Sequence, residues 1–307
     1  MNPDRQPETV KAYLEALRRA LKGAPAGLIA DALADAEEHL DNEIKQNQNR
    51  TEPEVLASVI ETYGTPEEIA EEYRSMEASI TSPFPKSEEP NERRFGFFNV
   101  LSDPHTYGAL LYMLLSLVTG TFYFTWTVTG LSLSVGFFIL IIGIPFALLF
   151  IGSVRVLALI EGRIVEGLLG VRMPRRLPPA TAAEETIGVK IKDALLDIRT
   201  WSSMLYLLLM LPLGVIYFTI AVTGIAVPLA ITGGAIYGLV TNDASNVFHM
   251  DGVTDYEMSW FNHFVHTAPG LIVLAICGLI VFFIVLHVVR GIGWLHGRIA
   301  ESLLVRL

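Results

Sequence analysis

The chain has 307 residues, of which 51% are hydrophobic and 18% are charged, and its mean hydropathy of +0.45 is too high for an ordinary soluble enzyme. The net charge of −10 lies almost entirely in residues 1–80, where 17 Asp and Glu face 8 Lys and Arg, a net of −9. Such an acidic segment argues against direct nucleic-acid binding, which needs Lys and Arg to neutralise phosphates.

Residues 7–77 show apolar residues at helical spacing and predict four short helices on one small core. Two capping boxes mark the starts of the last two helices, Thr51-Glu52-Pro53-Glu54 and Thr65-Pro66-Glu67-Glu68. Gly64 ends the helix between them. We therefore expect an acidic helical domain over residues 1–78, followed by a proline-rich linker over 79–102.

Three windows contain no Asp, Glu, Lys or Arg: residues 104–154, 200–242 and 258–289. A bilayer core takes roughly 20 apolar residues per helix, so the first window is long enough for two spans and each other window for one. We expect spans near 106–128, 132–154, 203–225 and 267–289. The pairs Thr129-Gly130 and Thr223-Gly224 are predicted to turn the chain back, because glycine adopts turn conformations easily.

An internal repeat divides the membrane part into two copies. Tyr123-Phe124-Thr125 and Val128-Thr129-Gly130 recur 94 residues later, whereas Arg155 and Gly162-Arg163-Ile164 recur 135 residues later. The difference, 135 minus 94, is a 41-residue insertion in the second copy at about 227–268. The repeats therefore cover 103–176 and 197–307. A cytoplasmic connector over 177–196 is predicted to join them.

Basic residues predict the orientation. Eight Lys and Arg lie between spans two and three, and none lies from Leu239 to Ala268. The positive-inside rule then places both termini and the acidic domain in the cytoplasm. Both repeats enter and leave on one side, so we expect parallel repeats. The predicted fold is all-α, a four-helix transmembrane bundle behind a small soluble helical domain.

The insertion begins with an apolar, glycine-rich stretch over 227–240, which could be re-entrant, interfacial or part of a span. A polar outer loop follows. Its acidic and histidine side chains are predicted to bind the signal or ligand: His249, Asp251, Asp255, Glu257, His263 and His266. These groups suit zinc, and histidine also titrates near pH 6.5 without metal, so both alternatives stay open. The spacing of these residues matches no known metal-binding motif. A solvated loop without a ligand is the alternative. No cofactor is predicted.

Amphipathic tails follow spans two and four, and each suits a helix at the cytoplasmic membrane surface. Their charged residues are predicted to relay the signal to soluble partners: Glu161, Arg163, Arg298 and Glu301. Simple anchoring helices are the alternative. The patterns Gly293-x-x-x-Gly297 and Gly234-x-x-x-Gly238 allow close helix approach, within one chain or in a homodimer.

Catalytic motifs with a nucleophile elbow or a phosphate-binding glycine loop are absent from the sequence, so we expect no enzyme activity. A small-molecule or lipid transporter is one alternative, although each expected span lacks acidic residues, Lys and Arg. A metal-dependent membrane enzyme is the other.

Two family resemblances rest on particular residues. Glu37-Glu38-His39 and the run from Tyr63 to Ala70, which contains Gly64-Thr65-Pro66, resemble the HAAS-type helical domain. That resemblance implies a bacterial inner-membrane signalling protein with a PadR-like regulator as cytoplasmic partner. Ile142-Gly143-Ile144-Pro145 and Glu161-Gly162-Arg163 resemble the bacterial "putative sensor" membrane domain. It implies sensing of an envelope or membrane condition, and neither family brings catalytic residues to carry over.

Overall fold

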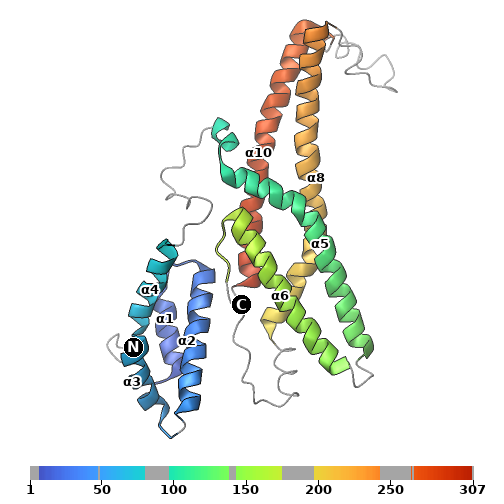
Figure 1. The fold of residues 1–307 in the computed structure, drawn as a ribbon. Coiled ribbons are helices and arrows are strands. Elements are labelled where there is room, and N and C mark those ends of the chain that lie inside the picture. Colours follow the sequence, from blue (N-terminus) through green and yellow to red (C-terminus); the bar gives the residue numbers. More distant parts are fainter. Residues whose placement is uncertain are drawn as a thin grey trace. The chain divides into compact units, whose positions relative to one another are not determined.

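The computed structural model describes residues 7–47, 49–79, 97–137, 143–174, 197–242, 264 and 266–305. Every regular element in these ranges is helical (Figure 1). Four short helices come first, a 3-10 helix η1 (Phe97–Leu101) follows, and four long apolar helices complete the described chain. The predicted all-α fold, with a small helical domain ahead of four long apolar helices, is confirmed.

The N-terminal helical domain, here called the head, comprises residues 7–79. It begins with α1 (Val10–Ala20) and α2 (Ala26–Gln46) and continues with α3 (Glu52–Tyr63) and α4 (Pro66–Ser79). All four helices contribute to one cluster of buried side chains, which forms the core of the head: Tyr13, Leu17, Leu21, Ala32, Ala36, Leu40, Val55, Leu56, Val59, Ile60, Ile69 and Ala70. The head therefore has a hydrophobic core of its own.

Both predicted capping boxes are present in the head. The N–H of Thr51 donates to the carboxylate of Glu54 at 3.1 Å, and the N–H of Thr65 donates to Glu68 at 2.9 Å. These backbone hydrogen bonds stabilise the charged carboxylates and hold the pKa of both glutamates below the ordinary value. Gly64 lies between the two helices at φ +115°, a conformation that favours glycine.

Contacts divide the chain into two compact units. The first comprises Met1–Glu88, Phe122–Leu209 and His296–Leu307, and the second comprises Glu89–Thr121 and Met210–Leu295. The head therefore belongs to the same unit as parts of the long helices. The direction of the two repeats relative to each other stays a prediction.

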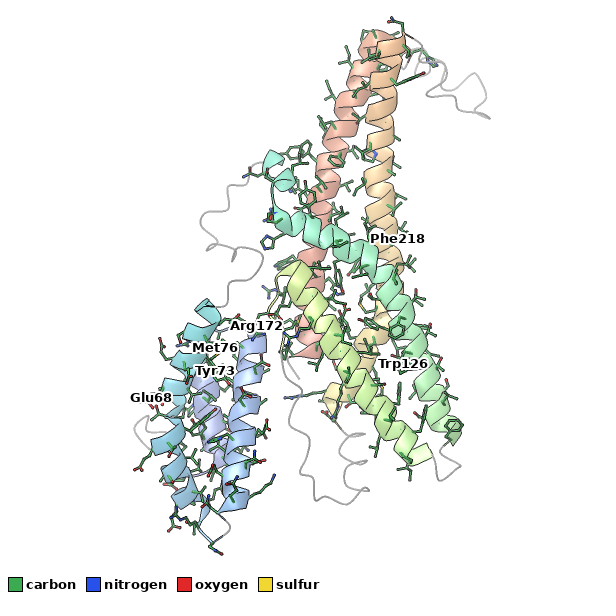
Figure 2. The ribbon with its side chains drawn as sticks, in the orientation of Figure 1. Glu68, Tyr73, Met76, Trp126, Arg172 and Phe218 are labelled. Carbon is green, nitrogen blue, oxygen red and sulfur yellow. The ribbon has the colours of Figure 1, made fainter. Side chains whose placement is uncertain are left out.

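The four long helices are α5 (Pro104–Phe137), α6 (Gly143–Leu169), α8 (Ile198–Thr241) and α10 (Ala268–Leu304). Each is long and apolar enough to cross a membrane. Many of their outward side chains are large and apolar, and Val240 is 76% exposed (Figure 2). Such surfaces are favourable against lipid and costly against water. The helices thus fit a multi-pass membrane protein.

The predicted turns at Thr129-Gly130 and Thr223-Gly224 are wrong, because α5 and α8 run through both pairs. The helix α6 accordingly begins at Gly143 rather than near residue 132. A Cβ on Gly130 would lie 2.2 Å from the ring of Phe150, and a Cβ on Gly224 would lie 2.8 Å from Val285. These glycines therefore allow close packing between helices rather than a change of direction.

The insertion in the second repeat lengthens both of its helices. Helix α8 has 44 residues against 34 in α5, and α10 has 37 against 27 in α6, so each is ten residues longer than its counterpart. The apolar stretch over 227–240 is part of α8 rather than a separate element. The rest of the predicted outer loop, residues 243–263, lies outside the described residues.

Candidate functional site

The predicted signal-binding residues of the outer loop are only partly described. Five of them lie outside the described residues: His249, Asp251, Asp255, Glu257 and His263. His266 is exposed in the turn that precedes α10. Among the residues that the structure describes, no group of three His, Cys, Asp or Glu side chains could hold a metal ion. The loop hypothesis therefore stays a prediction.

The predicted amphipathic tails are the last turns of α6 and α10 and not separate helices. Among the four predicted relay residues, Glu161 is fully buried, whereas Arg163 and Arg298 are exposed and Glu301 is half-buried. Burial of a carboxyl group in this position requires hydrogen-bond partners. This distinguishes Glu161 from the other three.

Four buried polar side chains meet around Glu161, one from each long helix, and they are here called the polar junction: Tyr123, Glu161, Tyr206 and His296. Tyr123 donates its hydroxyl hydrogen to Glu161 Oε2 at 3.0 Å. The hydroxyl of Tyr206 lies 3.1 Å from Glu161 Oε1 and 2.9 Å from His296 Nε2. All four residues lie in the first unit and are at most 3% exposed.

The hydrogen bonds of the polar junction have two arrangements, because a phenol carries one hydrogen. When Tyr206 donates to an ionised Glu161, His296 Nε2 must carry a hydrogen and donate to the hydroxyl oxygen. When Glu161 is protonated, it can donate to Tyr206, which then donates to an unprotonated His296 Nε2. The same heavy-atom positions therefore suit two protonation states.

The internal repeat explains the make-up of the polar junction. Glu161 and His296 are separated by 135 residues, the offset of the second repeat block, so an acid and a base stand at equivalent positions. Tyr206 is the counterpart of Tyr112, whose hydroxyl instead donates to Met210 Sδ at 3.8 Å. The sequence-based prediction named Glu161 but missed its three partners. The Glu-to-His difference directly before the repeated Gly-Arg-Ile was the available signal.

Two ion pairs occur at equivalent places in the two units. Arg155 donates to Asp197 at 3.0 Å in the first unit, and Arg290 lies 3.1 Å from Asp103 in the second. Each pair joins the arginine of one repeat to the aspartate that opens the other. An ion pair of this kind therefore occurs in both units, whereas the polar junction lies in the first unit.

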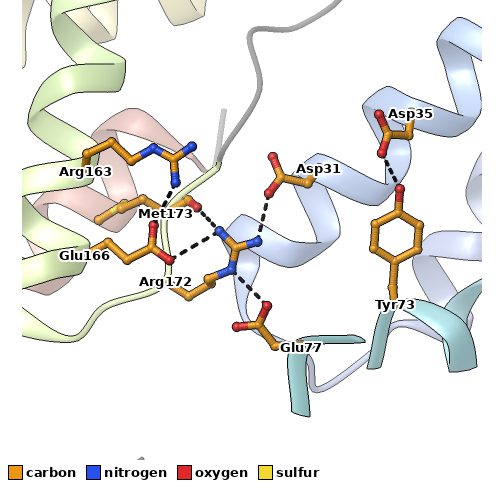
Figure 3. A network of polar contacts seen from close by, with 8 residues as sticks. All are labelled: Asp31, Asp35, Tyr73, Glu77, Arg163, Glu166, Arg172 and Met173. Carbon is orange, nitrogen blue, oxygen red and sulfur yellow. Dashed lines mark hydrogen bonds and ion pairs between the residues drawn. The ribbon is translucent and has the colours of Figure 1, made fainter. Parts of the chain in front are cut away.

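The end of α6 is connected to the head through Arg172 (Figure 3). The guanidinium lies 3.0 Å from Asp31 on α2 and 3.2 Å from Glu77 on α4. It also lies 3.5 Å from Glu166, which pairs with Arg163 at 3.3 Å. The Arg172 and Asp31 side chains are only 10% and 8% exposed, so this network is more shielded from water than a typical surface ion pair.

Residues 171–173 are held between the head and two long helices. A Cβ on Gly27 of α2 would lie 2.7 Å from the carbonyl oxygen of Arg172, so only glycine permits this approach. Met173 is 1% exposed and packs on Gly162 of α6. Val171 packs on Gly297 of α10, where a Cβ would lie 2.6 Å from Val171 Cγ2. The 171–173 segment is thus a fixed part of the first unit.

Comparison with protein families separates the head from the part of the chain that contains the long helices. The model of the "Putative sensor" family matches residues 79–304, and the HAAS model matches residues 12–72. The chain belongs to the "Putative sensor" family. This sensor protein therefore combines a HAAS domain with a sensor domain, in the order that the sequence predicted. No curated protein and no solved structure matches the chain.

Proposed function

We propose that this membrane sensor protein relays its state through the head to a cytoplasmic transcriptional regulator of the PadR-like kind. The family and the four apolar helices support a membrane sensor or regulatory protein. HAAS domains are commonly associated with PadR-like regulators, which supports the identity of the partner. Both termini and the head face the cytoplasm in this proposal, following the basic residues beside the spans.

The observation that carries this proposal is the Arg172 network. Arg172 follows α6 directly and reaches two acidic residues of the head, Asp31 and Glu77. A movement at the end of α6 therefore acts on α2 and α4 at once. Release of Arg172 would leave two acidic side chains on the head for basic groups of a partner. The network thus supports a latch, in which the head is either held or free.

The test uses the full-length protein in nanodiscs and purified PadR-like regulators from the same organism. Arg172→Gln removes the charge that joins the head to α6. We expect this change to increase regulator binding by up to about tenfold, because a latched fraction lowers the apparent affinity in proportion. Microscale thermophoresis measures the dissociation constant.

Arg163→Gln is the matched control. Arg163 lies on the same helix end, is 47% exposed and pairs with Glu166, the residue that Arg172 also contacts. If Arg172 alone holds the head, regulator binding to this variant should equal that of the wild type; a change would instead support the predicted relay role of Arg163. Absence of regulator binding to both the wild type and Arg172→Gln would overturn the proposed relay.

We also propose that the outer loop takes the input signal, as its cluster of histidines and carboxylates suggests. Deletion of residues 241–262 tests this in a reporter strain that follows the regulator. An unchanged response to envelope stress would contradict the proposal. A lost response with normal membrane insertion would support it.

A further inference from the structure

The polar junction and the 171–173 segment rest on adjacent residues of the same two helices. Gly162 directly follows Glu161 on α6 and contacts Met173. Gly297 directly follows His296 on α10 and contacts Val171. A change in the distance between α6 and α10 at the polar junction therefore alters the contacts that Gly162 and Gly297 make with the 171–173 segment. Arg172, in the middle of this segment, holds the head.

We propose that Glu161, Tyr206 and His296 form a proton-binding site whose occupancy controls whether Arg172 holds the head. The proposal rests on the proposed function in treating the head as the output. It adds an input, the proton, that acts from within the helix bundle rather than at the outer loop. Glu161 and His296 lie seven residues beyond the predicted span ends at 154 and 289, or about 10 Å along the helices.

The proposal takes the ionised carboxylate as the state at high pH. Both oxygens of Glu161 face a tyrosine hydroxyl, and hydroxyl donors stabilise the charged form. In this state Tyr206 donates to Glu161 and accepts a hydrogen from His296 Nε2. The three helices α6, α8 and α10 are then joined through one hydroxyl group.

Acidification adds one proton to the set formed by Glu161, Tyr206 and His296, and its charge changes from −1 to zero. The new hydrogen on Glu161 bonds to the oxygen of Tyr206, and Tyr206 turns its own hydrogen to His296 Nε2, whose hydrogen moves to Nδ1. The charge-assisted bonds to Glu161 are replaced by weaker neutral ones. The tie between α6 and α10 weakens, and the 171–173 segment is released.

The titratable groups that meet at the junction come one from each packed helix: Tyr123, Glu161, Tyr206 and His296. Nearby charged residues of the first unit have partners of their own. Arg155 pairs with Asp197, and Glu166 pairs with Arg163 and Arg172. In this step the added proton is therefore carried by Glu161, and His296 changes only the nitrogen that holds its hydrogen.

The test measures the distance between the head and α6 in the full-length protein in nanodiscs. The chain has one cysteine, Cys277, so Cys277→Ser gives a clean background for spin labels. Glu38→Cys labels the exposed surface of α2, and Gly167→Cys labels α6 at a position where a Cβ meets no atom within 4 Å. Double electron–electron resonance then reports the latched and released populations.

We expect one narrow distance at about pH 8 and a second, released population at about pH 5, a range that covers the titration of carboxyl and imidazole groups. The ratio of the two populations changes about tenfold for each tenfold difference in proton affinity between them. Arg172→Gln should show the released population at both pH values and so identifies it.

Glu161→Gln and His296→Gln should each remove the dependence on pH. Tyr112→Phe is the matched control, because Tyr112 is the equally buried repeat counterpart of Tyr206 and contacts a thioether. It should retain the full pH response. A wild-type distance that is identical at both pH values, or a Glu161→Gln protein that still follows pH, would overturn the proton site. Regulator binding is a separate readout, so a normal pH response without regulator binding would overturn only the relay.

Discussion

The two units of this protein contain the same helix contacts but different polar chemistry. The pair Arg155 and Asp197 in the first unit has its counterpart in Arg290 and Asp103 of the second. Gly130 against Phe150 likewise has its counterpart at equivalent positions in the second repeat. The polar junction occurs in the first unit, whereas the counterpart of its central tyrosine contacts a methionine.

This difference distinguishes contacts that hold the helices together from the polar junction, which is the candidate functional site. A contact that both copies keep serves the packing that both copies need. An acid and a base at equivalent repeat positions, buried and bridged by one hydroxyl, occur in the first unit and favour a purpose specific to it. Buried ionisable groups are costly, so their presence beside Tyr206, where the counterpart tyrosine contacts a thioether, favours a role beyond packing.

Alanine at the glycines that contact the backbone of a neighbouring helix should destabilise the protein equally from either repeat, and this is the largest expected effect. A Cβ on Gly120 or on Gly214 would lie 2.3 Å from a carbonyl oxygen, of Met210 or Ser116 respectively. We expect each variant to lose roughly 3 kcal/mol of stability, because backbone cannot move aside as a side chain can. SDS unfolding of the purified protein measures the loss.

Gly152→Ala is the control for this pair of variants, since a Cβ there meets no atom within 4 Å. It should be neutral or slightly stabilising, because alanine favours helix over glycine. Full stability of Gly120→Ala beside a destabilised Gly214→Ala would show that the two repeats do not share this contact.

Removal of one hydroxyl should distinguish the two units. Tyr206→Phe leaves Glu161 and His296 without their bridging group, and we expect a loss of about 2 kcal/mol. Tyr112→Phe removes a weak hydrogen bond to sulfur, and we expect a loss of less than about 1 kcal/mol. The same unfolding assay compares them. Equal losses of stability in the two variants would show that Tyr206 contributes no more than its repeat counterpart Tyr112.

Neutralisation of either aspartate should cost a similar amount of stability in the two units. Asp197→Asn removes the pair with Arg155, and Asp103→Asn removes the pair with Arg290 and also the charge 3.0 Å from His105 Nδ1; the aspartates are 30% and 17% exposed. We expect about 1 kcal/mol or less for each, because water screens such pairs. Thermal unfolding at low and high salt measures both losses. A several-fold larger effect of one variant would show that its pair has a further role.

The two capping boxes of the head give the smallest expected effect. The pKa values of Glu54 and Glu68 are lowered by the N–H groups of Thr51 and Thr65 in the folded state. Their stabilisation is therefore complete above the unfolded pKa of about 4.3 and is lost as the pH falls through the folded values. NMR titration of the side-chain carboxyl carbons measures both. Midpoints at or above the unfolded value would contradict the capping contribution.

Much of the architecture was predictable because it depends on local chemistry. Apolar windows free of charge predicted four long helices, and the capping boxes placed the starts of α3 and α4 correctly. The turns at Gly130 and Gly224 were predicted wrongly, since a glycine in an apolar helix serves close packing as readily as a turn. Only the neighbouring side chain, Phe150 or Val285, distinguishes the two uses.

The sequence by itself determined the helical head, the four apolar helices, the repeat and the charge pattern, because these follow from composition and short-range spacing. The tertiary structure alone decided which polar groups meet. Glu161 and His296 are 135 residues apart, and Arg172 is 141 residues from Asp31. Spacing along the chain marked Glu161 and His296 as equivalent positions but did not show that they meet, since such contacts form only when separate helices pack and exclude water from the groups between them.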